Sequence, residues 1–146
     1  IQLHMIGKLQ SNKVKFVVPL FDYIHSLDSL KLAKKISVEQ EKINKKLKIF
    51  IQINIGNEDQ KSGISEDQLV DFHKKCVQDL NLDIIGLMCL PPKDGDNIKY
   101  FLKMTNLAKK LQVNELSMGM SSDYLEAAKT GSTFLRIGSR IFGERA

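Results

Sequence analysis

Two short segments near the C-terminal end of the chain carry the residue types best suited to binding a phosphate group. Ser117–Asp123 combines a glycine, several hydroxyl groups and the predicted start of a helix, and Gly138-Ser139 places an unhindered backbone beside a further hydroxyl. Backbone N–H groups at a helix start are unpaired and the helix dipole makes that end positive, so both favour an anion. A Ser/Gly turn is common in proteins, so it is the pairing of the two segments that favours a phosphate site.

Arg136 adds a charge to the second segment. It lies in the strand predicted over residues 132–138, where it shares one face with Phe134 and Gly138. An arginine in such an apolar strand needs an acceptor, because burying an unpaired charge costs several kcal/mol. Two interpretations stay open: a structural salt bridge to a neighbouring strand or loop, and a donor directed at a ligand in the mouth of the fold.

Alternating strand and helix patterns predict how these segments are brought together. About six βα units without a flexible linker imply a parallel sheet with right-handed crossovers, whose strands place ligands at their carboxyl ends. The units fit either an open doubly wound sheet or the last six units of an eight-stranded (β/α)8 barrel, and length alone does not choose between them. Strands are expected over residues 1–7, 23–27, 48–54, 83–90, 115–118 and 132–138.

Helices are expected between these strands, with boundaries taken from periodicity and capping residues. Ser65 with Gln68 three residues later predicts a capping box, and Ser122 is expected to cap a short helix that ends at Lys129. Further helices are predicted over residues 12–20, from Ser29 onward, and over 97–112. The helix over 97–112 is expected to bury one side made of Ile98, Phe101, Leu102, Thr105, Ala108 and Leu111.

Composition bounds the class of protein. A chain of 146 residues with 42% hydrophobic and 27% charged residues is expected to form a single globular domain over residues 1–146. No apolar run approaches the roughly 20 residues that cross a bilayer, and the first residues lack signal-peptide features. The net charge of +5 is carried by lysines spread along predicted helices, which indicates solvated surfaces rather than a nucleic-acid interface.

Cysteines and histidines give no metal site. The three histidines are scattered without ligand spacing, and the two cysteines, Cys76 and Cys89, lack a CxxC motif. Buried free thiols are typical of a reducing compartment. We therefore expect a cytoplasmic location, or a mitochondrial one in a eukaryote.

Several motifs in the expected order resemble the YggS/PROSC family of pyridoxal phosphate (PLP) homeostasis proteins. The resemblance covers essentially the whole chain, although Leu3 stands where the family usually has tryptophan. The motifs are His4-Met5-Ile6-Gly7-Lys8-Leu9-Gln10-Ser11-Asn12-Lys13, Gln52-Ile53-Asn54, Lys61-Ser62-Gly63-Ile64, Gly86-Leu87-Met88, Ser117 to Ser121, Gly131-Ser132-Thr133 and Arg136 to Arg145.

This resemblance implies a barrel like the N-terminal domain of alanine racemase, with PLP as cofactor at its mouth. Arg136 is then expected to face the pyridine nitrogen, and Ser117 or Ser121 to bind the phosphate with Gly138 and Ser139. Asn54 and His4 are expected to line the pocket. For Asn54 the alternative is a side chain that caps its own loop, and for His4 a satisfied histidine of the barrel interior.

The resemblance also implies a Schiff-base lysine on the first barrel strand, and no lysine of this chain matches that position. We therefore expect the chain to be an N-terminally truncated copy that opens at the third strand, without the first two βα units. The alternative is a true short form that lacks Schiff-base chemistry.

Three functions stay open. The resemblance favours a PLP carrier or buffer without established catalysis, expected to be a monomer that delivers PLP to PLP-dependent apoenzymes. The alternatives are a PLP-dependent amino-acid racemase, which needs two bases, and another phosphate-binding barrel. A barrel that acts on a sugar phosphate is expected to place acidic residues at its strand ends, where this chain has Asn54, Met88-Cys89 and Ser117.

Overall fold

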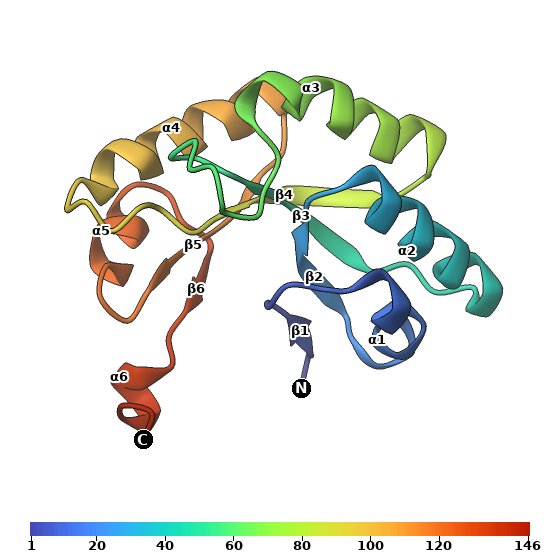
Figure 1. Ribbon diagram of the computed structural model, residues 1–146, viewed down its shortest axis with the longest axis horizontal. Coiled ribbons are helices and arrows are strands. Elements are labelled where there is room, and N and C mark those ends of the chain that lie inside the picture. Colours follow the sequence, from blue (N-terminus) through green and yellow to red (C-terminus); the bar gives the residue numbers. More distant parts are fainter.

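The chain folds around a curved sheet of six parallel strands that follow one another in the sheet as they do in the sequence. This computed structural model describes all residues from 1 to 146. Helices cover the convex side of the sheet and leave the concave side open (Figure 1). A doubly wound sheet reverses its strand order and carries helices on both faces. The structure instead has the arrangement of six consecutive βα units of a barrel.

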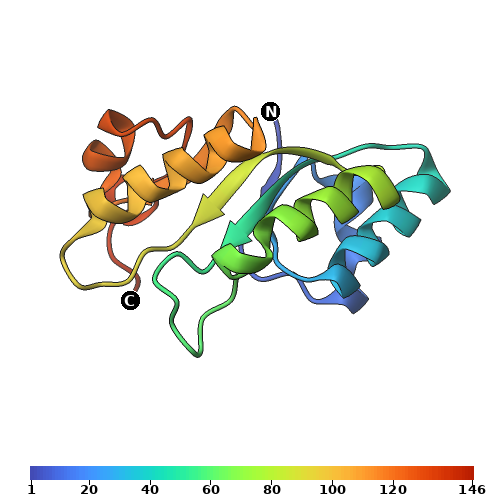
Figure 2. The same ribbon diagram turned by 90° about the horizontal axis from the view of Figure 1, so that it is seen from above.

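Each strand is followed by helical structure. The strands are β1 (His4–Met5), β2 (Tyr23–Leu27), β3 (Lys48–Ile53), β4 (Asp83–Cys89), β5 (Glu115–Met120) and β6 (Phe134–Arg136). The helices are α1 (Val14–Leu20), α2 (Leu30–Ile43), α3 (Glu66–Lys74), α4 (Asn97–Leu111), α5 (Tyr124–Lys129) and α6 (Ser139–Phe142). A 3-10 turn, η1 (Ser11–Lys13), precedes α1, and a π-helical turn, η2 (Lys75–Asp79), continues α3. Seen from above, α2, α3 and α4 lie side by side over the strands (Figure 2).

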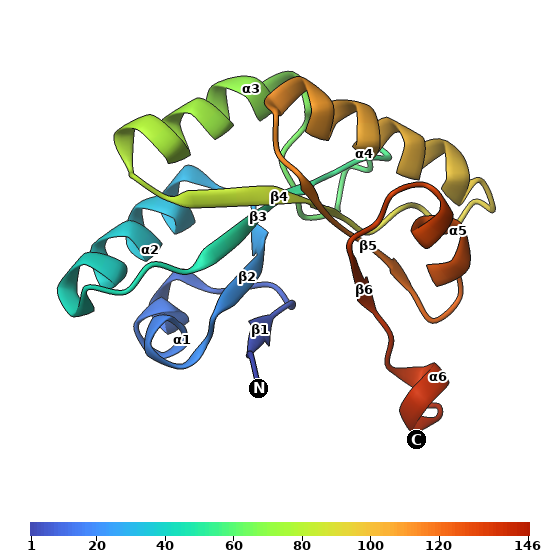
Figure 3. The same cartoon turned by 180° about the vertical axis from the view of Figure 1, so that it is seen from behind.

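The two outer strands are shorter than the sequence predicts. The patterns over residues 1–7 and 132–138 give only β1 (His4–Met5) and β6 (Phe134–Arg136). Both strands have a neighbour on one side only, so few backbone groups are paired along them. Conversely, β5 continues to Met120, beyond the predicted end at Met118. Both ends of the chain lie on the open, concave side of the sheet (Figure 3).

Two predicted helix caps are wrong. Ser65 precedes α3, but its side chain makes no capping hydrogen bond, so the predicted capping box is absent. The N-cap of α5 is Asp123 rather than Ser122, and its Oδ1 accepts a hydrogen bond from the Met120 N–H at 2.7 Å. This carboxylate therefore fixes the loop before the helix instead of the first helical turn.

Helix α4 is rotated relative to the predicted face. Ile98 and Leu102 are 49% and 51% exposed, although both were expected to be buried. The buried residues are Tyr100, Phe101, Met104 and Ala108. Tyr100 and Met104 therefore occupy the apolar stripe in place of Ile98 and Leu102, because the i, i+3, i+4 pattern fits both stripes and packing on the sheet decides between them.

The two faces of the sheet have different surroundings. Ile49, Ile51 and Ile53 of β3 belong to a cluster of 29 buried residues between sheet and helices. Fully burying such a side chain stabilises the fold by about 1.5–3 kcal/mol. Alternation along the strand places Phe50 on the concave face, where a small cluster of Tyr23, Phe50 and Met88 is buried. No helix is long and apolar enough to cross a bilayer.

Candidate ligand-binding site

The loops after β5 and β6 meet at Ser121. Its Oγ accepts hydrogen bonds from the Gly138 and Arg140 N–H groups, both at 3.3 Å. The strand register pairs Met120 with Arg136, so Ser121 directly follows the strand partner of that arginine. Two long hydrogen bonds leave the Ser121 hydroxyl proton free to donate to a ligand. The structure therefore brings Ser121, Gly138 and Arg136 together, as the sequence predicts.

Gly138 and Ser139 present an open backbone at this position. Both residues are exposed. A Cβ added to Gly138 would meet no atom within 4 Å, so the approach to its backbone is unobstructed. Ser139 is the first residue of α6. The Ser121 hydroxyl and the Ser139 N–H are donors at one end of the sheet, and the Gly138 N–H can join them by exchanging its long bond to Ser121 Oγ. This is suitable chemistry for an oxyanion.

Arg136 lies half-buried on the concave face and forms no salt bridge. Its guanidinium donates to the Ser117 carbonyl at 2.9 Å, to Ser117 Oγ at 2.7 Å and to the Cys89 carbonyl at 2.9 Å. Burial lowers the pKa of Arg136, and no carboxylate is among its hydrogen-bond partners. A guanidinium has five N–H donors, so these three bonds leave the Nε–H and one Nη2–H for a ligand. The predicted alternative of a structural salt bridge is therefore wrong.

Ser117 does not lie with the phosphate-binding loops. It is fully buried within β5, and its Oγ lies between Arg136 and the Nδ1 atom of His25, which is 2.7 Å away. Because this hydroxyl is already engaged, Ser121 is the serine placed to contact a phosphate. The strand was predicted to end at Met118, which placed Ser117 near its end. Because β5 continues to Met120, Ser117 lies in the middle of the strand.

A buried histidine pair extends this hydrogen-bond network, and the sequence did not predict it. His25 is 1% exposed, and its Nε2 lies 3.0 Å from Nδ1 of His4. Burial, and then the nearby His4 and Arg136, lower the pKa of His25 to about 4. His25 is therefore neutral at neutral pH. The signal that could have found this pair is a titratable residue, His25, within a strand that is buried along its whole length.

His4 is part of the interior of the sheet. Its ring stacks on Tyr23 with 4.1 Å between centroids and 8° between planes. Burial lowers its pKa, an effect that Asp22 partly opposes. In the sheet His4 pairs with Tyr23, the first residue of β2, and Tyr23 pairs with Lys48, the first residue of β3. His4 therefore lies level with the beginnings of these two strands. The geometry matches the alternative of a satisfied interior histidine rather than a residue that lines the pocket.

Asn54 caps its own loop. Its Nδ2 donates to the Glu58 carbonyl at 2.7 Å and its Oδ1 accepts from the Glu58 N–H at 3.1 Å. The loop-capping alternative is thus what the structure shows. Asn54 also borders a cavity of about 310 Å³ at the carboxyl ends of β1, β3 and β4, lined by Ile6, Gly7, Lys8, Gln52, Ile53, Asn54, Gln60, Lys61, Ser62, Met88 and Leu90.

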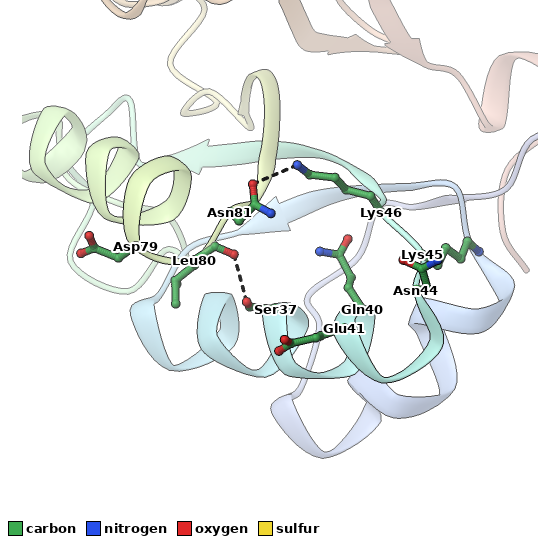
Figure 4. Close-up of a pocket in the computed structure, with 9 residues that line it drawn as sticks. All are labelled: Ser37, Gln40, Glu41, Asn44, Lys45, Lys46, Asp79, Leu80 and Asn81. Carbon is green, nitrogen blue, oxygen red and sulfur yellow. Dashed lines mark hydrogen bonds between the residues drawn. The ribbon is translucent and has the colours of Figure 1, made fainter.

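A groove of about 410 Å³ lies at the opposite edge of the sheet, between the end of α2 and the turn before β4 (Figure 4). Several of its polar groups are bonded to one another or to nearby backbone. Ser37 donates to the Leu80 carbonyl at 2.9 Å, and Lys46 donates to Asn81 Oδ1 at 3.2 Å. Lys45 donates to the Pro19 carbonyl at the end of α1 and to the Phe21 carbonyl in the loop before β2. The side chains of Glu41, Asn44 and Asp79 remain free, but the groove lies at the amino ends of β3 and β4. Parallel α/β folds place their ligands at the carboxyl ends of the strands, so this groove is not the candidate site.

The chain is similar to proteins of known name over nearly its whole length. The family model described as alanine racemase, N-terminal domain, matches residues 2–146. A pyridoxal phosphate homeostasis protein of Pasteurella multocida is 38% identical, over 99% of this chain and 66% of that protein. One of Synechocystis is 40% identical, over 99% of this chain and 71% of that protein. The chain thus spans about two thirds of the length of these relatives.

Solved structures give the same result. PipY of Synechococcus elongatus without PLP superposes with a TM-score of 0.91 at 32% identity, over 98% of this chain and 71% of that chain. The same protein with PLP bound gives 0.89 at 31% identity, over the same 98% and 71%. Alanine racemase of Corynebacterium glutamicum shares the fold, with a TM-score of 0.69 at 15% identity, over 94% of this chain and 40% of that one.

Proposed function

The chain belongs to the alanine racemase N-terminal domain family, among its pyridoxal phosphate homeostasis proteins, and we propose that it binds PLP where β5 and β6 end and carries or buffers that cofactor. The predicted fold, the alanine racemase N-terminal type of barrel, is confirmed by the same comparisons. The proposal concerns the contacts that this chain's own residues make with PLP.

The observation that carries the proposal is a half-buried guanidinium without a carboxylate partner, next to two loops whose donors are free or only weakly bonded. The free N–H groups of Arg136 would donate to the pyridine nitrogen. The Ser121 hydroxyl and the backbone N–H groups of Gly138 and Ser139 would bind the phosphate. Phosphate and pyridine are separate acceptors on one small molecule, and the site offers a separate set of donors for each. His4 and Asn54 have no role in this proposal, because their side chains are used within the chain.

The positive charge of Arg136 opposite the pyridine nitrogen favours a protein that carries PLP over an enzyme that uses it in catalysis. Bound PLP supplies an electron-withdrawing ring that is strongest when this nitrogen is protonated. A permanently charged arginine donates to the nitrogen and does not accept its proton, so the ring stays neutral there. The racemase alternative needs two bases, and an arginine opposite the pyridine nitrogen suits it only where other groups help to stabilise the carbanion.

We further propose that the protein is a monomer that delivers PLP to PLP-dependent apoenzymes. A cytoplasmic location is part of the same proposal. It is supported by Cys76 and Cys89, which are both unpaired thiols, as is typical of reducing compartments.

Replacing Ser121 by alanine tests the phosphate contact. We expect Ser121→Ala to weaken PLP binding by about tenfold, since one hydrogen bond to a charged group contributes about 1.5 kcal/mol. Pyridoxal, which has no phosphate, should bind wild type and variant equally. Fluorescence titration with both ligands measures the dissociation constants.

The matched control is Ser122→Ala, because Ser122 is the next residue, is exposed and makes no side-chain hydrogen bond. It should bind PLP as wild type does. Equal PLP affinities for the Ser121 and Ser122 variants, or PLP binding no tighter than that of pyridoxal, would contradict the proposed phosphate site.

A further inference from the structure

We propose that His25 is a positioning residue for Arg136, which holds the guanidinium through Ser117 so that its free N–H groups face the pyridine nitrogen. The inference rests on the proposed PLP site. It adds to that site a residue of β2, a strand that supplies none of the proposed ligand contacts.

The direction of each hydrogen bond follows from the one group that can only donate. Arg136 donates to Ser117 Oγ at 2.7 Å, and the proton of this fully buried hydroxyl needs an acceptor of its own. Nδ1 of His25, also at 2.7 Å, is the acceptor within reach, so the Ser117 hydroxyl donates to it. His25 therefore carries its proton on Nε2, which donates to Nδ1 of His4 at 3.0 Å. This tautomer is assigned from the network. With this tautomer, each hydrogen bond in the series from Arg136 to His4 joins one donor to one acceptor.

Electrostatics agree with this assignment. A protonated His25 would present an N–H to Ser117 Oγ, which already accepts from Arg136, and would place a second positive charge near the guanidinium. Burial, His4 and Arg136 all lower the pKa of His25, to about 4, so the neutral form prevails at neutral pH. The groups around His25 are His4 on β1, Tyr23 on β2, Phe50 on β3, Ser117 on β5, and Phe134 and Arg136 on β6.

Packing fixes the imidazole in this orientation. Its ring stacks on Phe50 with 4.4 Å between centroids, and Phe134 meets it edge-on at 5.9 Å. His25 is 1% exposed, so water has little access to replace it. Without His25, the Ser117 hydroxyl would lose its acceptor and would be free to turn. Arg136 would then keep the Ser117 carbonyl but lose the fixed position of the second partner of its Nη1 group.

Two substitutions of His25 separate positioning from mere packing. We expect His25→Leu to weaken PLP binding by about tenfold, the effect of misplacing one charged hydrogen bond. His25→Gln offers an acceptor to Ser117 and a donor to His4, so it should recover most of the lost affinity. Inorganic phosphate, which has no pyridine nitrogen, should bind wild type and both variants equally. Titration of the purified protein gives the constants, and urea unfolding of each variant shows that it is folded.

His73→Leu is the control, because His73 lies on α3 outside this network; it should bind PLP as wild type does. Wild-type affinity in His25→Leu, or equally weak binding by the Gln and Leu variants, would overturn the inference while leaving the PLP site intact. A wild-type protein that does not bind PLP would instead refute the proposed function.

Discussion

Replacing Arg136 by methionine is expected to weaken PLP binding by about 10- to 100-fold. A hydrogen bond to a charged group contributes about 1.5–3 kcal/mol, and each 1.4 kcal/mol corresponds to a factor of ten. Methionine keeps the apolar stem but removes every donor that would face the pyridine nitrogen. Arg136→Lys should lose nearly as much, since an ammonium group does not reproduce the planar fork that spans Ser117 and Cys89. Dissociation constants from PLP titration test both variants.

The control for this experiment is Arg145→Met, because Arg145 is exposed near the C-terminus. It carries the same loss of charge and should leave PLP binding unchanged. Arg136→Met also removes the donor to the Ser117 and Cys89 carbonyls, so its unfolding free energy must be measured separately. A folded Arg136→Met protein with wild-type affinity for PLP would contradict the role of the guanidinium.

Replacing Gly86 by alanine is expected to destabilise the fold by roughly 3 kcal/mol or more, the range of severe overpacking. Gly86 of β4 pairs with Glu115, the first residue of β5. A Cβ at this position would lie 2.0 Å from the Glu115 carbonyl oxygen and 2.6 Å from its carbonyl carbon. Backbone atoms cannot turn away as a side chain does, so the two strands must separate. Urea unfolding monitored by circular dichroism measures the loss.

Gly7→Ala is the matched control for this substitution. A Cβ added to Gly7 would meet no atom within 4 Å, so the change in unfolding free energy should stay within about 0.5 kcal/mol. Equal stability of the Gly86 and Gly7 variants would show that β4 and β5 do not approach as closely as described.

Most of the fold could be predicted because each element carries a local signal. Alternating apolar runs and amphipathic helices gave all six βα units, and only the strand order was needed to exclude the doubly wound sheet. The edge strands β1 and β6 were predicted too long because their length depends on pairing, which an apolar pattern does not report. The face of α4 was missed for a similar reason, since two overlapping stripes fit the sequence and the sheet selects one.

The candidate site could be predicted in part. Ser121, Gly138 and Arg136 belong to contiguous motifs at strand ends, so parallel topology alone brings them together. The contact between His25 and Ser117 joins residues 92 positions apart across the concave face. It depends on the curvature of the sheet, and no local pattern records it. Asn54 and His4 were expected in the pocket because of their motifs, whereas their bonding partners are set by the loop and the neighbouring strand.

A crystal structure of the protein with PLP tests the central claim most directly. We predict the phosphate within hydrogen-bond distance, about 2.7–3.2 Å, of Ser121 Oγ and of the Gly138 and Ser139 N–H groups, with the pyridine nitrogen at Arg136. PLP bound in the groove at the opposite edge of the sheet, or bound with its ring away from Arg136, would contradict it.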